Sequence, residues 1–422
     1  AAARALLARA ATAADEKDVH ADLIELGGKI AMPPPVDGKT IAVLLPLSGK
    51  YALIGAELKA AVQLAPAEGT AWLFLDTKGD PDGAVAAVEA AAAKGVAGIL
   101  GPVGERESVA AARAAVQRGI PIGLLSPADG ADPGAGVFRL VESPADEGRA
   151  VARLAASDSF PTVAVFAPRD DVGAEAAAAF VAEARRLGLG VTAEGSYDPT
   201  GGNLEPDVKQ FLELVPARNA RLAAHLRRTG KKGWATFSPD VPYSLLYIPD
   251  RHDRAALVAA FLPYFNVELR TNDFPDVAML QRKHGGHTPQ VVQLVGGAGW
   301  HHPTLPLRGG AAVQGALIVD AFAGELGGDA GAAFAQEFTK RTKRSASAAA
   351  AQVHDAAALI ARARRQAAAS ADVRRALTTS IAHGGLDEAV AACGAATVGP
   401  DGEIARAAAV LEVQGDALVL AP

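Results

Sequence analysis

The chain of 422 residues has little that would indicate a disulfide-rich, membrane-spanning or nucleic-acid-binding protein. Its one cysteine, Cys393, excludes an internal disulfide, and the apolar setting AVAACGAA favours a buried small side chain over a reactive thiol. No apolar stretch approaches the ~18 residues that a membrane span needs. The net charge of −6 argues against a nucleic-acid partner, because such binding surfaces are usually basic.

Catalytic motifs are also absent from the sequence. The first apolar run ends in Pro-Leu-Ser-Gly rather than G-x-G-x-x-G, and Ser126-Pro127 lacks the G-x-S-x-G pattern of a nucleophile elbow. There is no Walker A lysine motif and no H-E-x-x-H. The pairs His284/His287 and His301/His302 lack a third ligand, which favours surface residues over a metal site. We therefore predict that the protein is not an enzyme and holds no cofactor and no metal.

The most informative segment that is present runs from Thr40 to Ala61. A nearly continuous apolar run, Ile41 to Leu47, ends at Ser48-Gly49 and passes into an alanine-rich helical pattern. Such a run indicates a strand buried on both faces, as in parallel sheets. Because open α/β sheets bind ligands at the carboxyl ends of their strands, the turn after this strand is a candidate binding edge.

Apolar runs and helical patterns alternate along most of the chain, which predicts doubly wound parallel sheets. We expect further strands over 71–76, 97–101, 121–126, 162–167, 244–249, 291–295 and 313–322. We expect helices over 83–94, 108–118, 146–156, 174–187, 331–343 and 348–366. Turn signals at Pro400-Asp401-Gly402 and Gly415-Asp416 instead predict antiparallel pairing in the tail.

Three segments stand outside this alternation. Residues 1–31 have a helical pattern without a visible signal peptide, and we expect them to be the remnant of an upstream helical domain, followed by a proline-rich linker at 32–37. The segments 216–242 and 267–289 are rich in Arg, Lys and His. They are either solvated helix faces with surface loops or a partner-binding projection on one lobe.

Short motifs in a fixed order resemble those of type I periplasmic solute-binding proteins, the branched-chain amino-acid-binding class. The resemblance covers residues 38–422 and implies a periplasmic protein of two doubly wound α/β lobes, joined by three crossovers and closing on a ligand by hinge motion. It places lobe 1 at 38–141 plus 300–385 and lobe 2 at 142–299 plus 386–422, with a candidate hinge at 296–299. The motifs are Pro46-Leu47-Ser48-Gly49, Asp76 with Gly79-Asp80-Pro81, Ile99-Leu100-Gly101-Pro102, Leu125-Ser126-Pro127-Ala128, Phe138-Arg139, Gln352-Val353-His354-Asp355-Ala356 and Pro400-Asp401-Gly402.

The ligand chemistry of that class is not preserved. Gly104-Glu105 and Asp129-Gly130 stand where the resemblance implies hydroxyl groups for an α-carboxylate, and Val172 stands where it implies an aromatic side chain. Ala298 occupies the place of the acidic residue that takes the ammonium. Because an unpaired buried ammonium or carboxylate costs several kcal/mol, we expect a different ligand or none.

The resemblance assigns ten residues to a cleft between the lobes. Trp300 either packs against the hinge or forms a wall of the cleft, while Ser48 and Tyr51 either cap the next helix or contact a ligand. Asp171 and Arg251 either line lobe 2 or are solvated surface. The ten residues are Ser48, Tyr51, Gly104, Glu105, Ser126, Ala128, Asp171, Arg251, Ala298 and Trp300.

A second branch of the superfamily, the bacterial penicillin-binding-protein activators, resembles this chain in its helical remnant, its proline linker and the phrases LLYIPD and QLVGGAGW. This resemblance implies a non-catalytic periplasmic protein that activates a cell-wall synthase by binding it, with a membrane anchor as an option in the full-length protein. The alternative is a solute-binding protein that delivers a small polar, amino-acid-like ligand to an ABC permease. Neither alternative involves nucleic acid.

Overall fold

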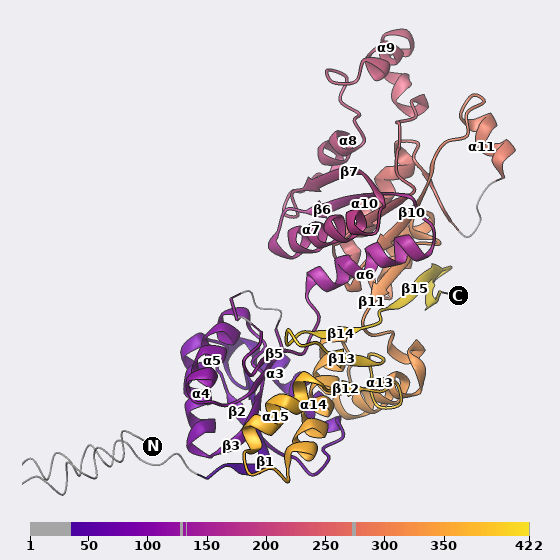
Figure 1. Ribbon diagram of the computed structural model, residues 1–422. Helices are drawn as coiled ribbons and strands as arrows, with labels where there is room; N and C mark the ends of the chain where they lie inside the picture. The colour runs from indigo at the N-terminus through magenta and orange to yellow at the C-terminus, as the bar shows by residue number, and fades with distance from the viewer. Residues whose placement is uncertain (1–34, 127–129, 132, 272–275, 422) are drawn as a thin grey trace, which may run out of the picture.

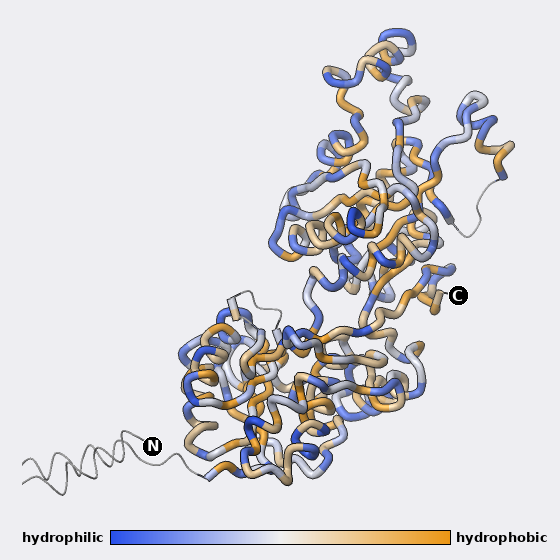
Figure 2. The backbone as a smooth tube through the Cα atoms, in the orientation of Figure 1, coloured by the Kyte–Doolittle hydropathy of each residue, from blue (hydrophilic) through white to orange (hydrophobic). Residues whose placement is uncertain are grey.

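The computed structural model describes residues 35–126, 130–131, 133–271 and 276–421, which form two α/β lobes (Figure 1). The predicted helical remnant at 1–31 and the first part of the linker lie outside the described residues, as does Ala128. None of the described helices is long and apolar enough to cross a membrane. Apolar residues follow the strands through the middle of both lobes, while hydrophilic residues gather on the outer loops and helices (Figure 2).

Lobe 1 is built around a five-stranded parallel sheet. The last five residues of the first strand, Ile41 to Leu45, are fully buried, because helices cover both faces of the sheet. This confirms the expectation from the apolar run. The strand order is β2 (Ala71–Asp76), β1 (Asp37–Leu45), β3 (Val96–Leu100), β4 (Ile122–Leu124) and β5 (Val137–Arg139).

Helices from two distant parts of the chain complete lobe 1. Several begin at side-chain caps: Asp80 accepts a hydrogen bond from the Gly83 amide, and Ser347 accepts one from the Ala350 amide. One face is covered by α4 (Pro81–Ala93) and α5 (Glu105–Gln117). The other is covered by α3 (Ala52–Leu64), α13 (Gly328–Thr342), α14 (Ala348–Ala367) and α15 (Val373–Ala382). The short helices η1 (Gly49–Tyr51) and η5 (Gly324–Leu326) precede α3 and α13.

Lobe 2 contains a larger mixed sheet. Its five central strands are parallel, in the order β7 (Gly190–Tyr197), β6 (Thr162–Pro168), β8 (Leu245–Ile248), β10 (Val291–Gly296) and β11 (Leu317–Asp320). The chain end adds antiparallel β15 (Ala409–Gln414) and β16 (Ala417–Leu420), and the short β9 (Glu268–Leu269) pairs with β10. The predicted turn at Gly415-Asp416 joins β15 to β16 and is confirmed.

The helices of lobe 2 lie on both faces of its sheet. A capping box at Ser143 and Asp146 starts α6 (Pro144–Ser157), which packs closely against α7 (Asp171–Arg186). The opposite face carries α8 (Glu205–Phe211), α10 (His252–Tyr264), η3 (Ala298–Trp300), α12 (Thr304–Gly309) and η4 (Gly310–Val313). Two basic segments project from this lobe as α9 (Ala220–Thr229) with η2 (Gly230–Thr236), and as α11 (Val277–Lys283) (Figure 1).

Three crossovers join the lobes, at residues 140–143, 321–323 and 407–408. The second and third differ from the expected boundaries at 300 and 386. Strand β11 still pairs with β10 of lobe 2, and the small antiparallel sheet of β12 (Gly385–Leu386), β13 (Ala396–Val398) and β14 (Ile404–Arg406) packs on lobe 1. The predicted turn at Pro400-Asp401-Gly402 joins β13 to β14 and is confirmed.

The glycine run at 296–299 is therefore not the hinge but a tight turn inside lobe 2. A Cβ atom on Gly299 would lie 2.5 Å from the carbonyl oxygen of Asp250, and one on Gly297 would overlap the carboxylate of Glu147. These glycines allow close packing at the end of β10, because a larger residue would collide with its neighbours.

Candidate ligand-binding cleft

Two adjoining cavities lie where the lobes meet. The first, which we name the hinge cavity, has a volume of about 940 Å³ and is lined by residues of both lobes and of all three crossovers. The second, the lobe 1 cavity, has a volume of about 860 Å³ and is lined by lobe 1 and the first crossover. Glu142 and Gln352 line both cavities, so the two form one cleft.

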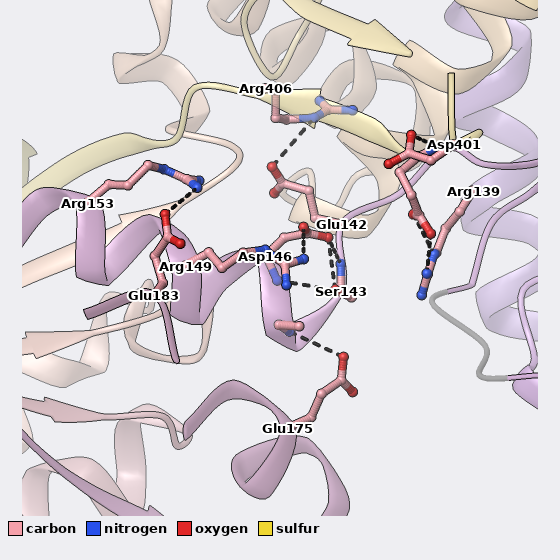
Figure 3. A network of polar contacts seen from close by, with 12 residues as sticks. Arg139, Glu142, Ser143, Asp146, Arg149, Arg153, Glu175, Glu183, Asp401 and Arg406 are labelled. Carbon is pink, nitrogen blue, oxygen red and sulfur yellow. Dashed lines mark hydrogen bonds and ion pairs between the residues drawn. The ribbon is translucent and has the colours of Figure 1, made fainter. Parts of the chain in front are cut away.

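A buried charge network joins Arg406 to Glu142 of the first crossover and to Asp355 of α14. Figure 3 shows its contact between Arg406 and Glu142. The Arg406 side chain is fully buried at the end of β14; its Nη1 donates to Asp355 Oδ2 at 3.1 Å, and its Nε lies 3.8 Å from Glu142 Oε1. Asp355 also accepts hydrogen bonds from the backbone amides of Ala392 and Cys393 at 2.7 and 2.9 Å. One arginine thus faces two carboxylates, one on α14 and one in the first crossover.

The two carboxyl groups differ in their proton affinity. Burial raises the pKa of Glu142 to about 7, although the Arg406 charge acts in the opposite direction. Burial also acts to raise the pKa of Asp355, but the hydrogen bond from His354 and the Arg406 charge outweigh it and hold this pKa below its usual value. At neutral pH Asp355 is therefore the firm partner of Arg406, and Glu142 is close to its protonation midpoint.

The charges on the lobe 2 wall are mostly satisfied within the protein. Asp250 accepts from Tyr197 Oη at 2.5 Å and forms an ion pair with Arg254. Glu147 accepts from Tyr247 Oη at 2.6 Å and from the Ala298 amide at 2.9 Å. Burial raises the pKa of Glu147, against the lowering effect of these two hydrogen bonds.

Two more pairs lie at the crossovers, one at the second and one between the first and third. His301 Nδ1 lies 2.6 Å from Asp320 Oδ2 at the end of β11, and Asp320 Oδ1 accepts from the Phe322 amide at 3.1 Å. Arg139, at the end of β5, forms a two-pronged ion pair with Glu403, the residue before β14 (Figure 3). These contacts fix the strand ends from which each crossover leaves.

The predicted site residues of lobe 1 are partly brought together. Tyr51, Gly104 and Glu105 line the lobe 1 cavity. The Ser48 hydroxyl instead donates to Asp76 Oδ2 at 2.5 Å and holds the turn after β1. Ser126 is buried, with 2% of its surface exposed.

The predicted residues of lobe 2 also divide into two groups. Arg251 and Ala298 line the hinge cavity, while Asp171 is exposed in the first turn of α7. Trp300 is fully buried, and its Nε1 donates to the Ile248 carbonyl oxygen at 3.0 Å. It therefore packs in the core of lobe 2 rather than forming a wall of the cleft.

The sequence analysis missed several residues that dominate the cleft, namely Glu107, Glu142, Glu147 and Arg406. Glu142 lies three residues after the Phe138-Arg139 motif, and this position was an available signal for it. Two further residues of the cleft region, Gln352 and Asp355, lie within a quoted motif but were not predicted as site residues. Arg406 lies in an alanine-rich stretch that gave no signal.

The profile of the periplasmic binding protein family matches residues 39–250 and 269–417. The chain belongs to this family. Its members are non-catalytic ligand-binding proteins of the periplasm or cell exterior, which confirms the predicted type I fold and the prediction that the protein is not an enzyme. No curated protein sequence matches this chain.

Solved structures of periplasmic binding proteins share this fold at low sequence identity. One, from Rhodospirillum rubrum and described as a branched-chain amino acid ABC transporter, has a TM-score of 0.70 and 19% identity, covering 90% of this chain and 99% of that one. A solute binding protein from R. palustris, in complex with benzoate, has a TM-score of 0.57 and 14% identity, covering 90% and 95%. A branched-chain amino acid transporter substrate binding protein from Streptococcus pneumoniae, in complex with isoleucine, has a TM-score of 0.55 and 14% identity, covering 92% and 99%. None of these three is a penicillin-binding-protein activator, so membership of that branch stays a prediction.

Proposed function

We propose that this chain is the solute-binding component of an ABC uptake system and that it holds a small polar ligand between its lobes. The observation that carries the proposal is the hinge cavity of about 940 Å³, whose lining comes from both lobes and all three crossovers. A cavity of this size fits a small organic molecule. A ligand that contacts both walls stabilises the closed arrangement by its differential contacts.

Two of the similar structures support this proposal over the activator function, because they are complexes with small organic molecules, benzoate and isoleucine. The residues of this cleft argue against an amino acid held in the usual manner. Gly104 and Glu105 offer no hydroxyl group for a carboxylate, and the Ala298 amide is already bound by Glu147. We therefore assign the cleft to a polar ligand other than a standard amino acid.

The test combines a thermal-shift screen with small-angle X-ray scattering. The screen contains amino acids, nucleosides, sugars, aromatic carboxylates, amines and peptidoglycan fragments, and a ligand that binds the native state raises the melting temperature by mass action. We expect one compound class to raise the melting temperature and to lower the radius of gyration as the lobes close. Gln352→Leu, at one of the two residues shared by both cavities, is expected to weaken this response, and Gln290→Leu, at an exposed residue before β10, is its control. A folded protein that responds to no compound in the panel would contradict the proposal.

A second candidate function, activation of a cell-wall synthase, is favoured by the projecting segment of α9 and η2. Arg227, Arg228, Lys231 and Lys232 are exposed there, and none of them forms an ion pair with the residues that the structure describes. Binding of a purified synthase, measured by calorimetry at low and high salt, tests this function. If the activator function is correct, charge reversal of these four residues should abolish binding of the synthase. The absence of binding by the unmodified chain would refute this function.

A further inference from the structure

A strong imbalance of charge lies in residues 216–242 of lobe 2, which we name the basic projection. These residues contain six basic side chains and one acidic side chain, Asp240. The basic projection therefore contributes +5 to the formal charge, and the rest of the chain contributes −11 to give the net −6. Positive charge gathered in one place on an otherwise acidic protein points to an anionic partner.

The basic projection is a folded element with a fixed base. His225 Nε2 of α9 lies 3.1 Å from the Gly233 carbonyl oxygen of η2, which joins the two helices. Asn266, which follows α10, donates to the carbonyl oxygens of Ala235 and Phe237 at 3.2 and 2.9 Å. The projection is thus tied to the body of lobe 2, and α9 lies at the end of this lobe that is remote from lobe 1 (Figure 1).

Four basic side chains of the projection have no counter-charge within the described protein. Arg221 pairs with Asp240 at 3.1 Å, so its charge is partly neutralised. The four that form no ion pair with the described residues are exposed and lie within residues 227–232, namely Arg227, Arg228, Lys231 and Lys232. Because like charges this close repel one another, a partner that neutralises them gains affinity.

The basic projection has no exposed apolar centre. Protein–protein interfaces bury apolar or aromatic side chains at their core and are depleted in lysine. The apolar side of α9 instead packs inward, where Leu222 is buried and Leu226 lies against the core of lobe 2. Trp234 packs against the same core, and none of the exposed large apolar side chains of the described residues lies within 216–242. This surface suits a partner that offers many negative charges and needs no apolar contact.

We propose that the basic projection docks the protein on a membrane by binding the phosphate groups of anionic phospholipids. A lipid surface presents many phosphates, and a cluster of lysine and arginine binds it without a shaped pocket. Each such side chain near the surface strengthens binding about fivefold, so the four unpaired ones together contribute about 600-fold. This inference goes beyond the proposed uptake function and does not depend on it.

The charge of the remaining chain gives this contact an orientation. An anionic membrane attracts the projection and repels the rest of the molecule, which carries −11. The hinge cavity lies where the lobes meet, whereas α9 lies at the remote end of lobe 2, so docking leaves the cavity open to a ligand (Figure 1). The contact is electrostatic and should weaken with salt, since the screening length falls from about 8 Å at 0.15 M to about 3 Å at 1 M.

Sedimentation with sucrose-loaded vesicles measures this binding. The anionic vesicles contain one third phosphatidylglycerol in phosphatidylethanolamine, and vesicles of phosphatidylcholine alone are the neutral reference. At low salt we expect the unmodified chain to bind the anionic vesicles at least about 100-fold more tightly than the neutral ones, and to be released near about 1 M salt. A variant with Arg227→Glu, Arg228→Glu, Lys231→Glu and Lys232→Glu should lose this preference.

A matched control changes the net charge by the same amount in lobe 1. Its four substitutions to glutamate are at exposed basic residues that are spread over the lobe, namely Lys39, Lys94, Arg113 and Arg344. Both variants change only exposed side chains, so both should keep the melting temperature of the unmodified chain. The control should bind anionic vesicles within about tenfold of the unmodified chain. An equal loss of binding in the two variants would show that net charge decides binding, and would overturn the assignment to the projection.

Energy transfer from a dye on the protein to an acceptor in the lipid tests the orientation. Because Cys393 is buried, a cysteine introduced at an exposed position is the one that the dye labels. Ala235→Cys places the dye on the projection, and Ala93→Cys places it at the end of α4 in lobe 1; both positions are exposed. We expect stronger transfer from residue 235. Equal or stronger transfer from residue 93 would contradict docking through the projection.

Two further outcomes would overturn the lipid assignment. The first is a folded, unmodified chain that binds neither kind of vesicle or binds both equally. The second is binding of a purified cell-wall synthase through the same four residues without binding of anionic vesicles, which would favour the second candidate function instead. Neither result bears on the ligand of the hinge cavity, which the thermal-shift screen tests separately.

Discussion

The substitution Asp355→Asn tests whether the buried charge network holds the hinge region together. Asp355 is fully buried and receives four contacts, from the amides of Ala392 and Cys393, from Arg406 and from His354. Asparagine has nearly the same shape, so packing is preserved. The substitution removes the negative charge and turns one acceptor oxygen into a donor amide.

The magnitude follows from what remains in the site. Arg406 keeps only Glu142, at 3.8 Å, as a charged partner, and Glu142 is about half neutral near pH 7. Breaking a buried ion pair by removing one partner typically costs about 3–5 kcal/mol. For a folding unit of about 200 residues, each kcal/mol lowers the melting temperature by about 2–4 °C. We therefore expect a decrease of about 6–20 °C for the unfolding of lobe 1.

Thermal unfolding followed by differential scanning calorimetry at pH 7 measures this decrease. The control is Asp387→Asn, since Asp387 pairs with Arg362 but has a side chain that is 74% exposed. Exposed pairs contribute little, so the control should shift the melting temperature by less than about 4 °C. A variant of Asp355 that melts no lower than this control would refute our account of the hinge network.

Three further substitutions test separate parts of the structure. Because the pKa of Glu142 is raised from 4.5 to about 7 in the folded protein, the unmodified chain should lose stability as pH rises through this range. Glu142→Gln has no such group, so its melting temperature should rise relative to that of the unmodified chain between pH 5 and pH 8. An equal difference between the two melting temperatures at both pH values would contradict this. Gly148→Ala should cost about 1–3 kcal/mol in urea unfolding, since a Cβ atom would lie 2.2 Å from the Ala176 carbonyl oxygen between α6 and α7, whereas Gly202→Ala, with nothing within 4 Å, should be nearly neutral. Trp300→Ala should lower the free energy of unfolding of lobe 2 by about 3–5 kcal/mol in the same assay. A loss of ligand binding without a loss of stability would instead indicate that Trp300 lines the cleft.

The fold was predictable where burial leaves a plain pattern in the sequence. Strand β1 is buried on both faces and therefore appears as an unbroken apolar run. Strand β7 lies at the sheet edge with alternating exposure, and its residues GVTAEGSY lack such a run, so it was not predicted. The hinge boundary at residue 300 failed for another reason: glycines that allow tight packing inside lobe 2 have the same composition as a flexible linker.

The cleft was less predictable because its chemistry arises from distant parts of the chain. Glu142, Asp355 and Arg406 meet only after all three crossovers have formed, and none of them belongs to a local motif with a known chemical role. The Gly104-Glu105 departure from the family pattern was visible in the sequence. That Glu107, two residues later, is buried beside Gly104 depends on the backbone of α5 and could not be inferred from composition.

The location of β15 and β16 has a consequence for biosynthesis. The sheet of lobe 2 gains its last strands from residues 409–420, and lobe 1 needs helices up to residue 382. At typical rates of about 5–20 residues per second, synthesis of the stretch from β1 to β16 takes roughly 20–80 s. Neither lobe has all of its strands and helices until near the end of that interval. The nascent chain thus exposes apolar strands while it is being made, a period in which a chaperone or export machinery can bind it before it folds.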